Sequence, residues 1–215
     1  TNQLLDFQKI ESNGVQLNPK PCHLNLQLVS IYEQFHNIAA LKDIELSIVL
    51  PTEDIYISID IDKIRTVIVN LLGNAIKYAQ SHIELKLETT EDTITIQVND
   101  DGCGVPKDQQ EKIFQLFYQV PDAPSSKGTG IGLAFSKILA EAHKGTLSLR
   151  DIPSGGSSFI LSLPKVDMTD TVNGNSAHKE DICEMETNKE VNTEKEKTTL
   201  LLVEDNPDLL SITRN

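Results

Sequence analysis

The sequence predicts an α+β fold, because two kinds of apolar periodicity occur in separate stretches of the chain. Residues 24–42 and 60–79 place apolar side chains every three or four positions, which is typical of amphipathic helices. HIELKLET (82–89) and TITIQVN (93–99) alternate apolar and polar residues, as half-buried strands do. After Pro164 the apolar pattern stops, so the predicted domain ends there.

The remaining elements follow in chain order. The stretch NGVQLNPKP (13–21) is rich in turn residues and predicts a break before the first long helix. Asp60 is a good N-cap for the second long helix. The other predictions are short strands at 45–51 and 54–59, a glycine loop at 100–106, a helix at 107–118, a helix opening at 128–134 and reaching His143, and closing strands at 145–152 and 157–164.

Composition excludes several functions. The formal net charge of −13 argues against a nucleic-acid partner, because duplex binding relies on Lys and Arg. No apolar run approaches the roughly 18 residues that span a bilayer, so we expect no membrane segment in this chain. The three cysteines, Cys22, Cys103 and Cys183, lack metal-ligand spacing, which indicates a reducing cytosol and disfavours zinc.

The helix that carries NLLGNAIKYA (70–79) has an unusual polar face. At about 100° per residue, Asn70, Asn74, Lys77 and Tyr78 share one face, beside an apolar stripe that points into a core. A solvated helix face is the alternative interpretation of this motif taken alone. Asn is disfavoured inside helices, however, so the pair also indicates ligands for Mg²⁺ and for phosphate oxygens.

Two glycine-rich motifs follow. In VNDDGCGVP (98–106) a strand ends on Asp100, whose carboxylate is suited to accept a hydrogen bond from an exocyclic amine such as that of adenine; an ordinary turn is the alternative. In GTGIGLA (128–134) three glycines precede a helix, where bare backbone N–H groups and the helix dipole favour phosphate. The prolines of QVPDAPSSK (119–127) fit a lid over a nucleotide.

The order of these motifs resembles the ATP-binding domain of sensor histidine kinases, within the superfamily shared with DNA gyrase, MutL and the heat-shock ATPase chaperones. The resemblance covers residues 19–165 and includes IFQLF (113–117) and Gly155–Ser157. It implies a two-layer α/β sandwich of the Bergerat type, with a mixed, mostly antiparallel sheet and helices on one face. Ile113, Phe114 and Phe117 of IFQLF are at helical spacing and are interpreted first as core and second as a docking surface for the substrate helices.

The resemblance also implies roles by position, with ATP and Mg²⁺ as cofactors. Asn74 would ligate magnesium, and Asn70 and Lys77 would act at the transferred phosphate. The implied cofactor-binding residues are Asn74, Lys77, Tyr78, Asp100, Gly102, Gly104, Lys127, Gly128, Thr129, Gly130, Ile131, Gly132, Leu133 and Ser157.

One position favours a kinase over a hydrolase. Where the gyrase and chaperone branches have a water-activating Glu, this chain has Asn70, and an amide cannot take a proton from water at neutral pH. The resemblance therefore implies a protein-histidine kinase domain, with an ATP-hydrolysing or nucleotide-switched binding module as the alternative. None of the five histidines has the sequence context of the family's phosphoacceptor, so no autophosphorylation is expected from this chain alone.

The chain is expected to divide into four parts. Residues 1–18 resemble the end of the dimerisation hairpin and a connector, 19–165 the kinase domain, and 166–197 a flexible acidic linker. LLLVEDNPDLL, within 198–215, resembles the truncated start of a receiver domain, with a chance acidic strand end as the alternative. The implied partners are the phosphoacceptor hairpin and a receiver domain in cis. The implied location is cytoplasmic, and the family includes inner-membrane sensors as parent proteins.

Overall fold

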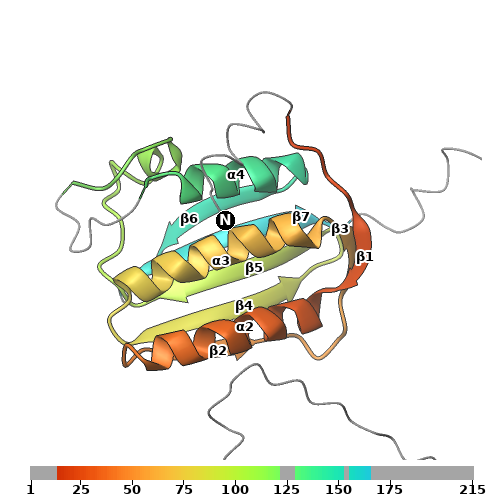
Figure 1. The fold of residues 1–215 in the computed structure, drawn as a ribbon, viewed down its shortest axis with the longest axis horizontal. Coiled ribbons are helices and arrows are strands. Elements are labelled where there is room, and N and C mark those ends of the chain that lie inside the picture. Colours follow the sequence, from red (N-terminus) through yellow and green to blue (C-terminus); the bar gives the residue numbers. More distant parts are fainter. Residues whose placement is uncertain (1–13, 122–128, 153–154, 166–215) are drawn as a thin grey trace, which may run out of the picture. The chain divides into compact units, whose positions relative to one another are not determined.

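The computed structural model describes residues 14–121, 129–152 and 155–165, and these form two layers (Figure 1). One layer is a five-stranded sheet with strand order β2-β4-β5-β7-β6, and the other consists of α2, α3 and α4. In chain order the elements are β1 (Lys20–His23), α2 (Leu24–Ala40), β2 (Glu45–Val49), β3 (Tyr56–Ile59), α3 (Ile61–Tyr78), β4 (His82–Thr89), β5 (Thr93–Asp100), the 3-10 turn η1 (Lys112–Phe114), α4 (Gly132–Ala142), β6 (Thr146–Asp151) and β7 (Ser157–Pro164).

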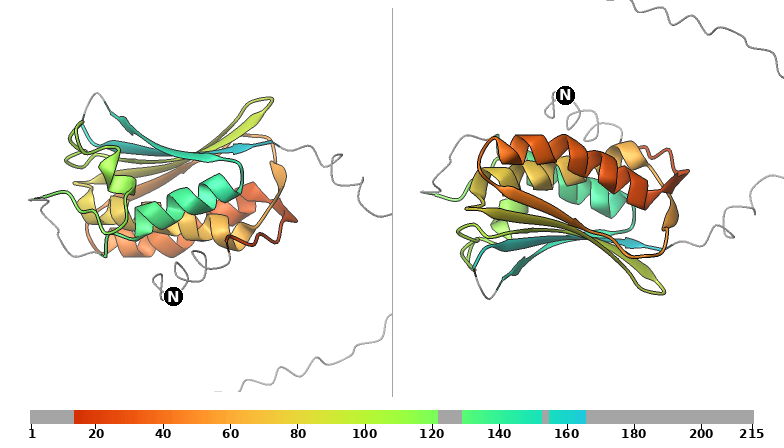
Figure 2. Two further views of the ribbon diagram at one scale, coloured as in Figure 1. Left: turned by 90° about the horizontal axis from the view of Figure 1, so that it is seen from above. Right: turned by 90° about the horizontal axis from the view of Figure 1, so that it is seen from below.

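The sheet is mixed but mostly antiparallel, as expected. Only β2 runs parallel to its neighbour, β4, while β4, β5, β7 and β6 pair antiparallel to one another. The helices cover one face of this sheet in both edge-on views (Figure 2). The predicted α+β class and two-layer sandwich are therefore confirmed.

Helix α3 forms the centre of the helical layer. Asp60 caps its start, because its side chain accepts a hydrogen bond from the Lys63 backbone N–H at 3.2 Å. The predicted apolar stripe is buried between α3 and the sheet, with Ile64, Ile68 and Leu71 fully covered. Burial of this stripe fixes which face of α3 remains available for a ligand.

Strands β4 and β5 determine where Asp100 lies. Their apolar residues alternate with more exposed ones, so one face packs on the helices and the other faces outward. The register pairs Ile83 with Asp100 and Asp100 with Ser157. Asp100 therefore ends β5 between β4 and β7, at the same end of the strands as the α3–β4 connection.

The predicted helix over 107–118 is wrong. The structure has only the single 3-10 turn η1 there, surrounded by turns. Ile113 is buried, but Phe117 is 63% exposed and has a φ of 62°, which no α-helix contains. The Phe117 N–H instead donates to the Gly130 carbonyl at 2.9 Å, so this segment is shaped by its partner and not by its own periodicity.

The break predicted over 13–21 also contains structure. Its last residues open β1, which pairs antiparallel with β3 in a separate two-stranded sheet. The sequence did not predict this strand because Pro21 argues against a central strand. Proline is tolerated in edge strands, and both strands of a two-stranded sheet are edge strands. Within the described ranges, no helix is long and apolar enough to cross a membrane.

Several predicted features lie outside the described residues. These are the helix tail over 1–12, Lys127 and Gly128, the linker over 166–197 and the receiver-like segment over 198–215.

Candidate functional site

A cavity of about 560 Å³ lies between α3, α4, the ends of β5 and β7 and the segment before residue 122. Its size is in the range of small-molecule sites. Its lining contains Val69, Asn70, Gly73, Asn74, Lys77, Tyr78, Asp100, Cys103, Gly104, Val105, Pro106, Ile113, Tyr118, Gln119, Val120, Pro121, Thr129, Gly130, Gly132, Leu133, Ser157 and Phe159. The three motifs singled out in the sequence thus meet at one cavity.

Asp100 is a buried acidic residue in the lining of this cavity, with 5% of its surface exposed. Its carboxylate accepts a hydrogen bond from the Gly102 N–H at 2.9 Å. Burial raises the pKa of Asp100 above its ordinary value, although backbone hydrogen bonds from Gly102 and Ser157 act in the opposite direction. A carboxylate held this firmly at a cavity wall is a well-defined acceptor for a ligand N–H group.

Close backbone packing around Asp100 accounts for two glycines. A Cβ at Gly156 would collide with the Asp100 carbonyl, and Gly156 also has a φ of +99°. A Cβ at Gly102 would collide with the Tyr78 carbonyl and lie 2.7 Å from Asp100 Oδ1. Gly102 itself does not line the cavity, so its predicted cofactor-binding role becomes one of close packing behind the wall.

The predicted polar face of α3 lies on the cavity, with Asn70, Asn74, Lys77 and Tyr78 all in its lining. Lys77 Nζ donates to the Tyr78 hydroxyl at 2.8 Å and lies 4.6 Å from the centre of the Tyr78 ring. Asn74 is half-buried, and its amide makes no hydrogen bond with any residue that the structure describes. An amide oxygen in this position fits a Mg²⁺ ligand, and the Lys77 ammonium fits phosphate.

Asn70 connects α3 to α4. Its Nδ2 donates to the Gly132 carbonyl at 3.3 Å and to the Ser136 hydroxyl at 3.2 Å. Ser136 is fully buried, so its hydroxyl depends on such partners. Sequence reasoning missed Ser136, although a serine four residues after Gly132, on the same helix face, was a usable signal.

The glycine-rich stretch is only partly on the cavity. Thr129, Gly130, Gly132 and Leu133 line it, whereas Ile131 is buried in the core. Helix α4 has no side-chain cap and no acidic residue in its first turn. Among the residues that the structure describes, nothing therefore opposes an anion at the N-terminal N–H groups and dipole of α4.

Sequence reasoning also missed much of the apolar lining, such as Val105, Tyr118 and Phe159. Their types are those of ordinary core residues, so spacing alone does not separate the two roles.

Fold and site together define a nucleotide-binding domain: a two-layer sandwich with a buried carboxylate, two amides, an ammonium and a helix start around one cavity. The chain belongs to the family of histidine kinase-, DNA gyrase B- and HSP90-like ATPases, whose match covers residues 59–167.

Relatives narrow the class further. The chain is 34% identical over 172 residues to the hybrid signal transduction histidine kinase D of Dictyostelium discoideum, covering 76% of this chain and 11% of that protein. It is 33% identical over 169 residues to the sensor histidine kinase WalK of Bacillus subtilis (strain 168), covering 76% of this chain and 28% of the relative. A histidine kinase P4 of Formosa agariphila is 30% identical and matches 100% of this chain but 17% of its own length. The chain thus spans less than a third of each of these proteins.

Solved structures agree with these relatives. The catalytic domain of the histidine kinase ThkA matches with a TM-score of 0.62 and 26% identity, covering 69% of this chain and 98% of that domain. Full-length ShkA, in a complex with AMPPNP, matches with a TM-score of 0.67 and 25% identity, covering 76% of this chain and 34% of ShkA. The described domain is a histidine kinase ATP-binding catalytic domain, homologous to those of sensor kinases such as WalK, which confirms the predicted class.

Proposed function

We propose that this domain binds ATP with Mg²⁺ and transfers the terminal phosphoryl group to a histidine on a dimerisation hairpin outside the chain. The observation that carries the proposal is the chemistry of the cavity lining. Among the described lining residues, Asp100 is the only carboxylate, and there is no histidine. With Asp100 assigned to adenine, the described lining residues include no carboxylate or imidazole that could activate water beside the phosphates. They also include no histidine that could accept the phosphoryl group.

The proposed placement of ATP follows from two parts of the cavity lining. Asp100 accepts the adenine amine, because it is a buried acceptor already oriented by Gly102 and Ser157. Lys77 and the start of α4 face the phosphates. Mg²⁺ supplies charge neutralisation at the phosphates, and Asn74 would hold it through its amide oxygen, since magnesium in nucleotide sites needs few protein ligands.

Asn70 has a positioning part in this proposal. Both N–H groups of its amide have acceptors on α4, the Gly132 carbonyl and the Ser136 hydroxyl. The amide nitrogen therefore holds the start of α4 against α3. That arrangement keeps the backbone N–H groups at the start of α4 in the same cavity as Lys77 and Asn74. Catalysis by positioning requires all of these groups to surround the transferred phosphate.

The proposed partner is the phosphoacceptor hairpin, and the residues directly after η1 offer it a contact surface. Leu116 and Phe117 are 38% and 63% exposed, directly before Tyr118 in the cavity lining. Exposed apolar side chains beside the phosphate site are suited to dock an apolar helix face. The buried Ile113 meanwhile packs in the core, so both interpretations of IFQLF have support from different residues.

We further propose that residues 1–18 end the hairpin, that 166–197 are a linker, and that 198–215 begin a receiver domain in cis. The match of P4 along the whole chain supports an organisation shared beyond the kinase domain. The proposed location is the cytoplasm, in keeping with the free thiols of Cys22 and Cys103.

The test uses ATP labelled on its terminal phosphate, this chain, and a separately produced acceptor hairpin of the parent protein. We expect Mg²⁺-dependent label on the hairpin's histidine, and none on a hairpin whose acceptor histidine is replaced by Gln. Label that appears only as free phosphate would instead support the ATP-hydrolysing alternative. Nucleotide binding with neither product would support a binding module that is switched by ATP.

A further inference from the structure

We propose that Asp101 is a positioning residue, which ties the connection between α3 and β4 to the loop after β5 and so fixes Lys77 and Tyr78 relative to Asp100. The inference rests on the nucleotide site proposed above. It concerns a side chain that does not line the cavity and therefore acts only through others.

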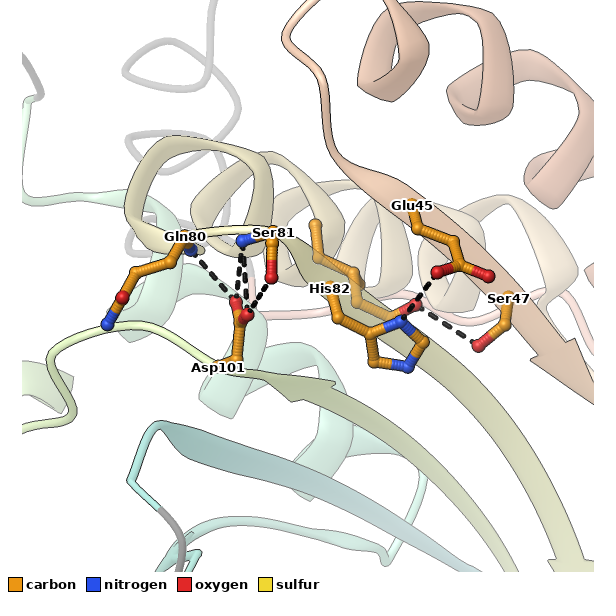
Figure 3. A network of polar contacts seen from close by, with 7 residues as sticks. Glu45, Ser47, Gln80, Ser81, His82 and Asp101 are labelled. Atoms are coloured by element: carbon orange, nitrogen blue, oxygen red, sulfur yellow. Dashed lines mark hydrogen bonds and ion pairs between the residues drawn. The ribbon is translucent and has the colours of Figure 1, made fainter.

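The carboxylate of Asp101 gathers three donors from two consecutive residues (Figure 3). The Gln80 N–H donates to Oδ1 at 2.8 Å. The Ser81 N–H is shared between the two oxygens at 3.1 and 3.0 Å, and the Ser81 hydroxyl donates to Oδ2 at 2.7 Å. One side chain thus holds two of the three residues, 79–81, that separate α3 from β4.

The connection is also held from its other side. The Ser81 carbonyl accepts the Glu45 N–H at 2.8 Å, at the start of β2. The Asp101 N–H donates to the His82 carbonyl at 3.2 Å, which continues the pairing of β4 with β5. In Figure 3 the His82 ring is directed toward Glu45 and away from Asp101, and the side-chain hydrogen bonds of Asp101 in this view go to Gln80 and Ser81.

The position of this connection matters because α3 ends against the Asp100 loop. The Tyr78 carbonyl lies so close to Gly102 that a Cβ there would collide with it. Tyr78 and Lys77 line the same cavity as Asp100. A shift of the chain at Gln80 and Ser81 therefore moves the last turn of α3, with Lys77 and Tyr78, relative to the buried Asp100 carboxylate.

Electrostatics keeps the contact intact at neutral pH. Partial burial would raise the pKa of Asp101, but hydrogen bonds from the Ser81 hydroxyl and from the backbone of Ser81, His82 and Gln80 outweigh it and hold the pKa well below its ordinary value. Asp101 therefore stays ionised and accepts all three donors.

The experiment uses the full 215-residue chain and its variants Asp101→Ala, Asp101→Asn and Ser81→Ala. Titration calorimetry measures the Kd for Mg-ATP, and amide hydrogen exchange measures protection of Gln80 and Ser81 without nucleotide. Asp92→Asn, an exposed acid at the far end of β5, is the matched control.

For Asp101→Ala we expect a Kd about tenfold higher and exchange at Gln80 and Ser81 at least about tenfold faster, the size of one lost charge-assisted hydrogen bond. Asp101→Asn keeps an acceptor oxygen and should recover part of the affinity. Because Lys77 shifts together with Tyr78, transfer to the hairpin at saturating ATP should also fall in Asp101→Ala and should be partly restored in Asp101→Asn. Asp92→Asn should leave every value unchanged.

The possible failures are distinguishable. Wild-type affinity in Asp101→Ala would overturn this inference and leave the proposed function standing. No ATP binding by the wild-type chain would overturn the proposed function, while unchanged exchange at Gln80 and Ser81 would separately overturn the contact. If Asp101→Ala does not fold, wild-type Kd values in both Asp101→Asn and Ser81→Ala would overturn the inference.

Discussion

Two parts of the cavity lining are built differently. In the first, the Asp100 end, Asp100 is buried at the end of β5, and backbone groups of Gly102 and Ser157 hold its carboxylate. In the second, the α3 end, Asn74 and Lys77 are half-buried side chains on the surface of α3. Lys77 bonds to the adjacent Tyr78, and Asn74 has no hydrogen-bond partner among the described residues.

This difference indicates a division of work. The Asp100 end is preorganised by the fold, so changes there should act on affinity for the nucleotide. The α3 end offers groups whose positions a metal and phosphates would complete, so changes there should act on transfer. Substitutions at the two ends should consequently have different kinetic signatures.

The largest expected effect is that of Asp100→Asn. An amide keeps the shape but loses the ionised acceptor, so we expect the Kd for Mg-ATP to rise by at least ~100-fold, beyond measurable binding. Folding should not suffer, because burial disfavours the ionised form that the substitution removes. Calorimetric titration together with thermal unfolding checks both parts. Unchanged affinity would refute the adenine assignment.

Asn74→Ala tests the other end. We expect transfer to the hairpin to fall about 100-fold or more, since a metal ligand and its charge placement are lost, while part of the nucleotide affinity remains. The measurement compares transfer rates at saturating Mg-ATP with the Kd of the same variant. Transfer at the wild-type rate would remove Asn74 as the metal ligand, and a loss confined to affinity would abolish the proposed division between the ends.

Two glycines provide a contrast in stability. Gly102→Ala should lower the free energy of unfolding by about 1–3 kcal/mol, because its Cβ has no room beside Tyr78 and Asp100. Gly73→Ala, at an exposed position of α3 in the cavity lining, meets nothing within 4 Å and should raise it by about 0.5–1 kcal/mol. Urea unfolding of both variants checks the signs. A stabilised Gly102→Ala would mean that the Asp100 loop is not tightly packed.

Parts of the site that depend on local patterns were predictable from the sequence, and parts that depend on contacts distant in sequence were not. The α3 face was predictable, because helical periodicity and the N-cap Asp60 are local signals. So was the end of β5 at Asp100, since alternation stops there. The role of Gly102 depends on the Tyr78 carbonyl, and the conformation at Phe117 depends on Gly130, both distant in sequence. Contacts of that kind leave no periodic trace, which is why the helix predicted over 107–118 was wrong.

The smallest expected effect separates two neighbours in the chain, Asp100 and Asp101. The pKa of Asp101 is lowered in the folded state, so the unfolded chain binds the proton first. The stability contributed by Asp101 is therefore present above its ordinary pKa of 3.8 and is lost as the pH falls below it. Asp100 has the opposite sign: its raised pKa gives a contribution that is present below 3.8 and is lost as the pH rises through the folded-state value.

Urea unfolding across acidic pH therefore provides a direct comparison of the two carboxylates. Relative to the wild type, Asp101→Asn should lose stability less steeply on acidification, and Asp100→Asn more steeply. The effect of Asp101 should be modest, because its partners Gln80 and Ser81 are exposed and water competes for them. Parallel curves for all three proteins would mean that neither carboxylate is perturbed by folding. If the two variants deviate from the wild type in opposite directions, ionisation is unfavourable for Asp100 in the folded state and favourable for the adjacent Asp101.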